Sequence, residues 1–173
     1  MTAAWTIAPF EGAHQQGVIG LISGIQRGEY NLPITPADQP DLMDIPGFYL
    51  NSAQGPGGFW VALDPRGAVA GTIAALNIGP DAVGRGQGAL RKMFVAREQR
   101  GTGLAAALLE TLAAWCAGPA IGIGALFLGT TDRFLAAHRF YEKHGFSHVA
   151  KACLPPSFPV MAVDTVFYTR RLG

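Results

Sequence analysis

The sequence predicts an α+β domain with a mixed, mostly antiparallel, twisted sheet flanked by helices. Two observations predict this class. Runs rich in aromatic and β-branched residues, Gly58–Leu63 and Ala68–Ile78, are joined by a tight turn and indicate antiparallel strands. A strand-like run at Gly88–Val95 then leads into an apolar helical run at Thr102–Cys116 and a further strand at Ile121–Thr130. This second pattern is typical of a strand–helix–strand unit embedded in an antiparallel sheet.

The elements before these strands are a strand, a helix and an irregular segment. Trp5–Phe10 is predicted to be a short strand closed by Pro9. Apolar residues at helical spacing predict an amphipathic helix over Gly12–Gln26. Asn31–Pro46 holds four prolines and three aspartates, so we expect an irregular lid or binding loop, with a short helix around Asp41–Asp44.

The remaining elements complete the predicted sheet. A polar, glycine-rich loop is expected at Gly79–Gly88, and a short helix at Leu135–His144. Two final strands, Phe146–Cys153 and Met161–Tyr168, are expected on either side of a proline-rich loop. Because no repeat or linker divides this pattern, residues 1–173 are predicted to form one domain.

The composition excludes several classes of protein. Hydrophobic residues make up 49% of the chain and charged residues 14%, which rules out general disorder. A net charge of +1 lacks the basic excess of a nucleic-acid binder. No apolar run reaches the roughly 18 residues of a membrane span, and no signal peptide is evident. Two cysteines and four histidines without CxxC indicate neither a disulfide framework nor a metal site, so we expect a cytoplasmic protein.

The turn Arg100–Ala105 is the main candidate for a binding site. It joins a predicted strand to a predicted helix and contains Gly101 and Gly103. The N–H groups and the dipole of a helix N-terminus favour an anion, and glycines let the backbone approach it closely. The turn therefore indicates a site for a phosphate or pyrophosphate.

Two common phosphate-binding motifs fit this turn poorly. A P-loop requires Gly-Lys-Ser or Gly-Lys-Thr, and the chain contains neither. The dinucleotide pattern GxGxxA is satisfied by Gly101–Ala106, but the acid expected about 20 residues later is missing. The turn also lies past the midpoint of the chain, which leaves no room for a doubly wound sheet. A small dinucleotide-binding domain is kept as an alternative.

A third pattern, Q/R-x-x-G-x-G/A directly after a strand that ends in valine, is filled by Arg100, Gly103 and Ala105. Here the chain resembles the GCN5-related N-acetyltransferase (GNAT) family. The segment Ala136–Phe146 resembles the later A-x-x-x-Y-x-K-x-G-F helix and turn of that family. The two motifs together span Leu90–Phe146, and the resemblance implies a GNAT-like acyl-CoA N-acyltransferase fold.

The resemblance implies acetyl-CoA as co-substrate, with its pyrophosphate in the turn and its pantetheine arm paired with the preceding strand. One N–H of that strand would polarise the thioester carbonyl as an oxyanion donor. The cofactor-binding residues implied in this way are Met93, Phe94, Val95, Arg100, Gly101, Thr102, Gly103, Leu104, Ala105 and Ala106.

The resemblance also assigns the acid of the reaction but not the base. Tyr141 matches the frequent general acid of the family, which protonates the departing thiolate. Phe134 stands where the family often has an asparagine that touches the cofactor. The glutamate of many relatives near the start of the strand before the turn is also missing, which leaves Glu29, Asp132 and His138 as candidate bases.

The acceptor is predicted from the acids and aromatic residues between Gln26 and Tyr49. Carboxylates and aromatic faces both favour a cationic amine. An equal alternative is that these acids, among them Asp41 and Asp44, only keep a proline-rich loop soluble. The predicted substrate residues are Glu29, Tyr30 and Asp132.

These observations predict an N-acetyltransferase that moves acetyl from acetyl-CoA to the primary amine of a small molecule, or of a peptide or protein. The amine would attack directly in a ternary complex, and the family resemblance suggests a homodimer. No metal, nucleic-acid or membrane partner is expected. The alternative from another class is a non-catalytic acetyl-CoA-binding or regulatory domain that has lost its base.

Overall fold

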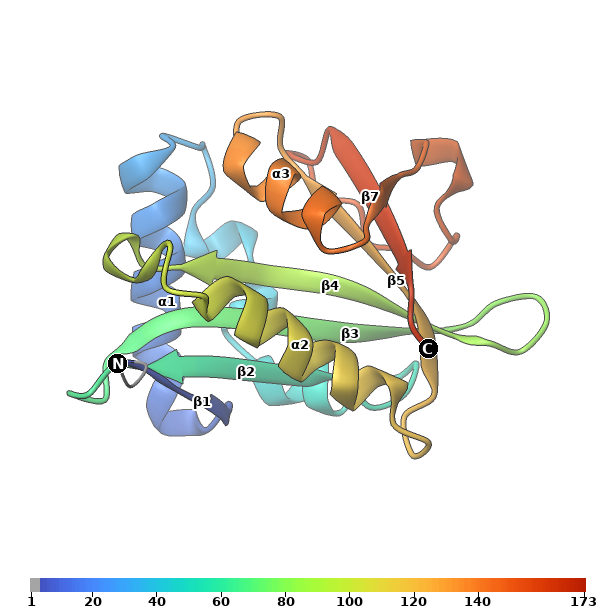
Figure 1. The fold of residues 1–173 in the computed structure, drawn as a ribbon, viewed down its shortest axis with the longest axis horizontal. Coiled ribbons are helices and arrows are strands. Elements are labelled where there is room, and N and C mark those ends of the chain that lie inside the picture. Colours follow the sequence, from blue (N-terminus) through green and yellow to red (C-terminus); the bar gives the residue numbers. More distant parts are fainter. Residues whose placement is uncertain (1–3) are drawn as a thin grey trace.

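The computed structural model describes residues 4–173, which form a seven-stranded mixed sheet with helices on both faces (Figure 1). The strands and α-helices are β1 (Thr6–Pro9), α1 (Gln15–Ser23), β2 (Gly58–Leu63), β3 (Val69–Pro80), β4 (Gly86–Val95), α2 (Leu104–Ala117), β5 (Ile123–Thr130), α3 (Leu135–Lys143), β6 (Ser147–His148) and β7 (Val166–Arg171). The strand order is β1-β2-β3-β4-β5-β7-β6, and only β4 and β5 are parallel neighbours. The predicted α+β class is confirmed.

Both faces of the central strands are buried. In β2, Trp60 and Ala62 belong to one apolar cluster, and Phe59 and Val61 belong to another, as the period of two along a strand requires. Helix α2 contributes to the first cluster and α1 to the second, so the two helices cover opposite faces of the sheet. The buried strands β2 and β3 therefore form a well-packed part of the sheet next to β4.

β4 and β5 pair only over a short stretch. Gly86–Ala89 of β4 lie opposite residues between Ile123 and Phe127 of β5, and the pairing stops there. β5 continues to Thr130 in register with β7, whereas the rest of β4 pairs with β3. The two strands therefore diverge toward the carboxyl end of β4 (Figure 1). Within residues 4–173, this divergence leaves one backbone edge of β4 without a strand partner.

A β-bulge lies in β4 just beyond the point of divergence. The register between β3 and β4 shifts so that Lys92 and Met93 together oppose Ile73. Lys92 has a φ of 53°, a left-handed conformation that costs a non-glycine residue roughly 1–2 kcal/mol. The hydroxyl of Thr72, which is fully buried, donates a hydrogen bond to the Lys92 carbonyl oxygen at 2.7 Å. This hydrogen bond stabilises the bulge, and the bulge changes the direction of the strand.

The predicted helix over Gly12–Gln26 is divided into three segments. A 3₁₀ turn at Gly12–His14 precedes α1, and a π-helical segment at Gly24–Glu29 follows it. The glycines of this run lower its helix propensity, which is one physical reason for an irregular course. The predicted irregular segment Asn31–Pro46 contains short 3₁₀ turns at Pro36–Asp38 and Pro40–Leu42, and a π-helical segment, Pro46–Leu50, begins at its end.

Three predictions about the sheet need correction. The strand predicted over Met161–Tyr168 begins only at Val166 and runs to Arg171, as β7. The loop predicted at Gly79–Gly88 is shorter, because β3 and β4 extend to Pro80 and Gly86 and the Asp81 carboxylate accepts backbone N–H groups inside the turn. The strand predicted over Phe146–Cys153 is reduced to β6. Beyond β6 the chain makes a 3₁₀ turn at Lys151–Cys153, and the prolines that follow cannot donate to a ladder.

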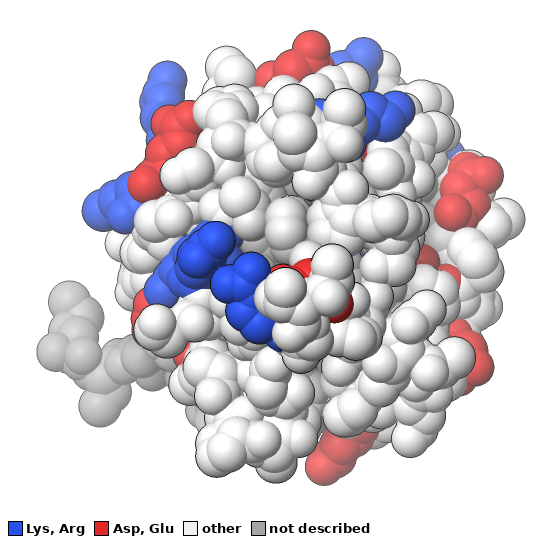
Figure 2. All heavy atoms as spheres, turned by 90° about the vertical axis from the view of Figure 1, so that its right-hand side faces the viewer, with Lys and Arg blue, Asp and Glu red and all other residues white. Residues whose placement is uncertain are grey.

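The surface at the β3–β4 turn end of the sheet carries mixed charge. In Figure 2, basic side chains form one group near the middle of this face and others toward its upper edge, and acidic side chains lie beside and around them. Neither positively nor negatively charged side chains cover the whole face, in keeping with a formal net charge of +1. Within residues 4–173, none of the helices combines the length and the apolar character that crossing a bilayer demands.

The Thr72 bond predicts a stability effect. Thr72→Val keeps the shape of the side chain but leaves the Lys92 carbonyl without its buried donor, so we expect a loss on the order of 1–3 kcal/mol in the free energy of unfolding. Urea denaturation measures it. Thr111→Val is the matched control, because Thr111 donates to a carbonyl within its own helix. Equal stability of the two variants would show that the hydroxyl does not hold the bulge.

Candidate active site

The larger of two neighbouring pockets lies where β4 ends and α2 begins. It is a cavity of about 540 Å³, bounded on its other side by α3. The predicted cofactor-binding residues that line it are Met93, Phe94, Val95, Arg100, Gly101, Gly103, Leu104, Ala105 and Ala106. The structure thus brings together nine of the ten. The exception is Thr102, whose hydroxyl instead donates to the Gln99 carbonyl oxygen at 2.6 Å.

The turn at the start of α2 presents free backbone donors to this pocket. Gly101 and Gly103 have φ values of 78° and 87°, which favour glycine. In the described part of the chain, no acceptor is found for the N–H groups of Gly101, Gly103 and Leu104–Ala106; the first turn of the helix closes with the bond from Ala107 to Gly103. Unpaired donors at a helix N-terminus form a site for an anion.

Arg100 lines the larger pocket and is bound to Glu29 at its edge. Its guanidinium donates two hydrogen bonds to the Glu29 carboxylate, at 2.9 and 2.8 Å, and its Nε donates to the Val95 carbonyl oxygen. The hydrogen bond from Arg100 holds the pKa of Glu29 below its ordinary value. Glu29 lines neither pocket, so the predicted substrate role of this acid is not supported by its position; the carboxylate instead ties the π-helical segment Gly24–Glu29 to the end of β4.

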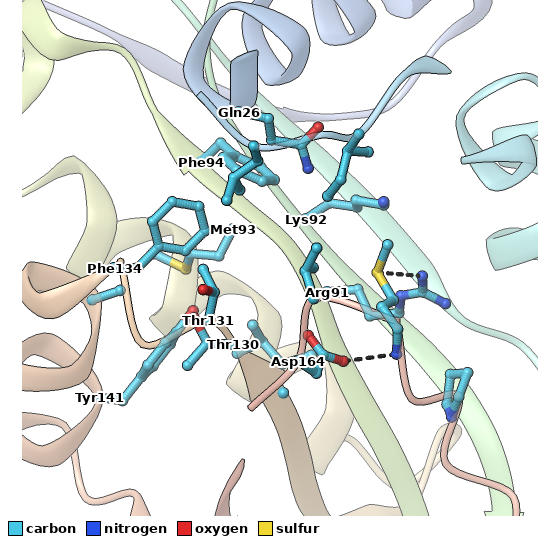
Figure 3. Close-up of a pocket in the computed structure, with 18 of the residues that line it drawn as sticks. Gln26, Arg91, Lys92, Met93, Phe94, Thr130, Thr131, Phe134, Tyr141 and Asp164 are labelled. Carbon is cyan, nitrogen blue, oxygen red and sulfur yellow. Dashed lines mark hydrogen bonds between the residues drawn. The ribbon is translucent and has the colours of Figure 1, made fainter. Parts of the chain in front are cut away.

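A second, smaller pocket of about 100 Å³ adjoins the first (Figure 3). It lies on the β5 side of β4, and its polar lining includes Gln26, Arg91, Lys92 and Asp164. The residues that line both pockets are Met93, Phe94, Phe134, Ala137 and Tyr141. The two cavities therefore meet between the unpaired edge of β4 and the inner face of α3.

Tyr141 occupies this junction. Its side chain is buried, with 5% of the residue exposed, and in Figure 3 its ring extends from α3 toward Thr130, Thr131 and Met93. Burial raises the pKa of the phenol well above its ordinary value. The hydroxyl therefore stays protonated at neutral pH and is a proton donor rather than an acceptor at rest.

Aromatic residues close the two pockets from the side of the first helix. Tyr30 and Phe134 pack edge to face with ring centroids 4.5 Å apart, and the Arg133 guanidinium donates to the Tyr30 carbonyl oxygen at 3.4 Å. Tyr30 lines the larger pocket but not the smaller one. Phe134, which replaces the asparagine of many GNAT relatives, thus supplies an apolar cover in place of a polar contact.

The acids of the loop between the first helix and β2 are engaged in structural contacts. Asp41 is buried, accepts the Tyr49 hydroxyl and lies 3.3 Å from the Lys92 ammonium. Asp38 and Asp44 accept backbone N–H groups at nearby turns. None of the three lines either pocket, so the pocket linings give no support to the predicted carboxylate wall for a cationic acceptor.

The other two candidate bases also lie outside the pockets. Asp132 is exposed and lines neither cavity, and its backbone N–H is bound by the Thr165 hydroxyl. His138 lies 2.9 Å from the Thr131 carbonyl oxygen through its Nε2. Sequence reasoning missed Asp164, which lines the smaller pocket. It falls inside a predicted strand, and no motif marks it.

Comparisons with known proteins agree with this geometry. The sequence model of the Acetyltransferase (GNAT) family matches residues 19–146, so the chain belongs to the GNAT family. The structure of a GNAT-family acetyltransferase from Staphylococcus aureus Mu50 is similar over 98% of this chain and 100% of that one, with 35% identity and a TM-score of 0.89. The predicted family is confirmed, and so is the fold.

Other relatives are N-acetyltransferases. The mouse protein named probable N-acetyltransferase family 8 member 5 is 34% identical over 113 residues, which cover 65% of this chain and 47% of that protein. A phosphinothricin acetyltransferase from Sinorhizobium meliloti, solved with acetyl-CoA, shares the fold, with 22% identity, a TM-score of 0.70 and coverage of 98% and 89%. The chain spans less than half the length of the curated relatives it matches. Family and relatives support the predicted acetyl-CoA-dependent N-acetyltransferase.

The buried ammonium of Lys92 predicts a pH effect on stability. Burial lowers the pKa of Lys92 to about 8, whereas an unfolded lysine keeps a pKa near 10.4, so the unfolded state binds more protons between these values. The contribution of Lys92 to stability is therefore least favourable below pH ~8 and rises with pH until lysine deprotonates in the unfolded chain. From pH ~7.5 to ~9.5 we expect wild type to gain roughly 1–2 kcal/mol relative to Lys92→Met.

Urea denaturation at the two pH values measures this difference. Lys151→Met, which removes an exposed lysine, is the control and should follow wild type. A pH dependence shared by wild type and both variants would mean that Lys92 titrates in the folded protein as it does in water.

Proposed function

We propose that this protein transfers acetyl from acetyl-CoA to the primary amine of a small molecule. The observation that carries the proposal is the junction of two pockets at Tyr141, beside the backbone edge that β4 leaves unpaired. One pocket supplies anion donors at a helix N-terminus, and the other is a small cavity with a few polar groups among apolar walls. A thioester carrier and a compact acceptor fit these two cavities.

The larger pocket suits acetyl-CoA in its shape and its donors. The free N–H groups of Gly101 and Leu104–Ala106 are placed for a pyrophosphate. The unpaired edge of β4 at Met93–Val95 is placed for an amide-containing chain, which would add to the sheet as a further strand does. With the pyrophosphate at the turn, a chain along this edge points its far end toward Tyr141.

The chemistry at the junction is acyl transfer by direct attack. The amine nitrogen forms a bond to the thioester carbon, and a β4 N–H near Met93 stabilises the negative charge that develops on the carbonyl oxygen. The carbon–sulfur bond then breaks, and the Tyr141 hydroxyl donates its proton to the departing thiolate. Because burial raises its pKa, the phenol is still protonated at neutral pH when the thiolate leaves, and it has a proton to donate.

The acceptor is proposed to be a small molecule because the smaller pocket is only about 100 Å³ and is walled by apolar side chains from several segments. Leu32 and Ile34 close it from the loop after the first helix, and Phe158 and Pro159 close it from the loop before β7. A peptide or protein amine remains a prediction from the sequence. Homodimerisation and a cytoplasmic location also stay predictions.

An acceptor screen tests the proposal. Purified protein is mixed with acetyl-CoA and ethanolamine, putrescine, L-alanine, L-aspartate or phosphinothricin, and free thiol is measured. We expect Tyr141→Phe to lower kcat with the best acceptor by about 10²–10⁴-fold while KM for acetyl-CoA changes little.

Tyr168→Phe is the matched control, because Tyr168 packs against the same ring but its hydroxyl is bound to Glu142. Acetyl-CoA binding with no transfer to any amine would favour the non-catalytic alternative. Full activity of Tyr141→Phe at every pH would show that Tyr141 is not the general acid.

A further inference from the structure

Asp164 is the carboxylate that lines the smaller pocket, and no other acid of the described chain lines either cavity. The rest of the lining is apolar, amide, hydroxyl or basic. An amine in this pocket, with its nitrogen turned toward the junction at Tyr141, therefore finds a single negatively charged side chain. In Figure 3 the Asp164 carboxylate lies beside Thr130 and below Arg91, and Tyr141 lies on the far side of Thr130.

The carboxylate is held in place by backbone contacts. One of its oxygens, Oδ2, accepts the Met161 N–H at 2.9 Å, while the Asp164 N–H donates to the Met161 carbonyl oxygen at 3.0 Å. Gly129 of β5 lies directly beneath it, because a Cβ at that position would come within 2.6 Å of Oδ2. The missing side chain of Gly129 makes the room in which the carboxylate sits.

The charges around Asp164 leave it available to a ligand. Arg91 and Lys92 of β4 face it, but no basic group lies within 4.0 Å in the described chain: the Arg91 guanidinium contacts the Met161 sulfur, and the Lys92 ammonium is bound to Gln39 and Asp41. Burial raises the pKa of Asp164, and the hydrogen bond from the Met161 N–H and the charges of Arg91 and Lys92 oppose the rise only in part. A carboxylate in this setting binds a proton more readily than one in water.

We propose that Asp164 binds the ammonium group of the acceptor and acts as the general base that takes its proton. This assignment rests on the proposed acetyl transfer and names the base which that function lacks. The ammonium gives one proton to the Asp164 carboxylate, and the neutral nitrogen attacks the thioester carbon. After the carbon–sulfur bond breaks, the thiolate takes the proton of Tyr141. The second proton of the nitrogen restores the phenol through water, and Asp164 releases its proton to solvent.

The variant that tests this role is Asp164→Asn. The amide keeps the shape of the side chain, and its oxygen can still accept the Met161 N–H. With the best acceptor of the screen, we expect kcat/KM at pH ~7 to fall by about 10²–10⁴-fold. Glu110→Gln, which changes an exposed acid of α2 that lines neither pocket, is the control and should match wild type.

The pH profile separates a base from a structural residue. Wild type accepts the ammonium form, so its kcat/KM should be flat from above the pKa of Asp164 up to the pKa of the amine. Asp164→Asn can use only the amine that is already neutral in solution, so its kcat/KM should rise about tenfold per pH unit toward the amine pKa near 10.4. A flat profile and an unchanged rate in Asp164→Asn would overturn the proposal and leave the acetyltransferase activity standing.

Thermal denaturation gives a second readout that needs no acceptor. Because burial raises the pKa of Asp164, its ionised form costs folding stability above that pKa, and the cost disappears as pH falls through it. Asp164→Asn should therefore melt at or above the wild-type temperature at pH ~7, with the gap closing in acid. A lower melting temperature would identify Asp164 as a structural cap. If wild type acetylates no amine of the panel, the proposed function fails and the base with it.

Discussion

The site depends on the point at which β4 and β5 stop pairing. Up to Ala89 the two strands are parallel neighbours, and beyond it β5 follows β7 while β4 follows β3. An edge of backbone donors and acceptors is costly to leave unpaired inside a folded protein, and here it is left beside a helix N-terminus that is also short of acceptors. Both features are satisfied by one ligand with an anionic end and an amide-containing arm. The proposed acetyl-CoA would therefore pair with both sets of unpaired backbone groups.

Two features that hold this arrangement lower the stability of the folded protein. Lys92 adopts a left-handed conformation at the bulge, and its ammonium is buried with Asp41 and Tyr49 rather than exposed. Buried ion pairs of this kind seldom add net stability, but they fix which way a strand turns and which side chains face a cavity. In β4 the result is that the Arg91 guanidinium contacts the Met161 sulfur and the Lys92 ammonium is bound to Gln39 and Asp41, while neither forms an ion pair with Asp164 in the described chain. Strain and buried charge at a site of this kind are expected where geometry matters more than stability.

The sequence predicted the parts of this structure that depend on local pattern. The strand–turn–helix unit at Arg100–Ala105 and the Tyr141 helix were found because glycine spacing and apolar periodicity are local signals. The acceptor side was not found in this way. Asp41 looked like a surface acid and is buried, and Asp164 lay hidden in a predicted strand, because both are defined by contacts between segments far apart in the chain. Asp164 reaches the pocket because the pairing of β5 with β7 brings the segment before β7 against Gly129, and no local pattern encodes that pairing.

Hydrogen exchange at individual segments, with and without saturating acetyl-CoA, measures whether the ligand satisfies these backbone groups. We expect slower amide exchange at Gly101–Ala106 and at Met93–Val95, where donors have no partner in the described chain or lie on the unpaired edge of β4. The β3–β4 turn at Asp81–Arg85, far from both pockets, should exchange at the same rate in both samples. Binding of acetyl-CoA without slower exchange in these two segments would show that the ligand does not pair with the free backbone groups of β4 and the turn.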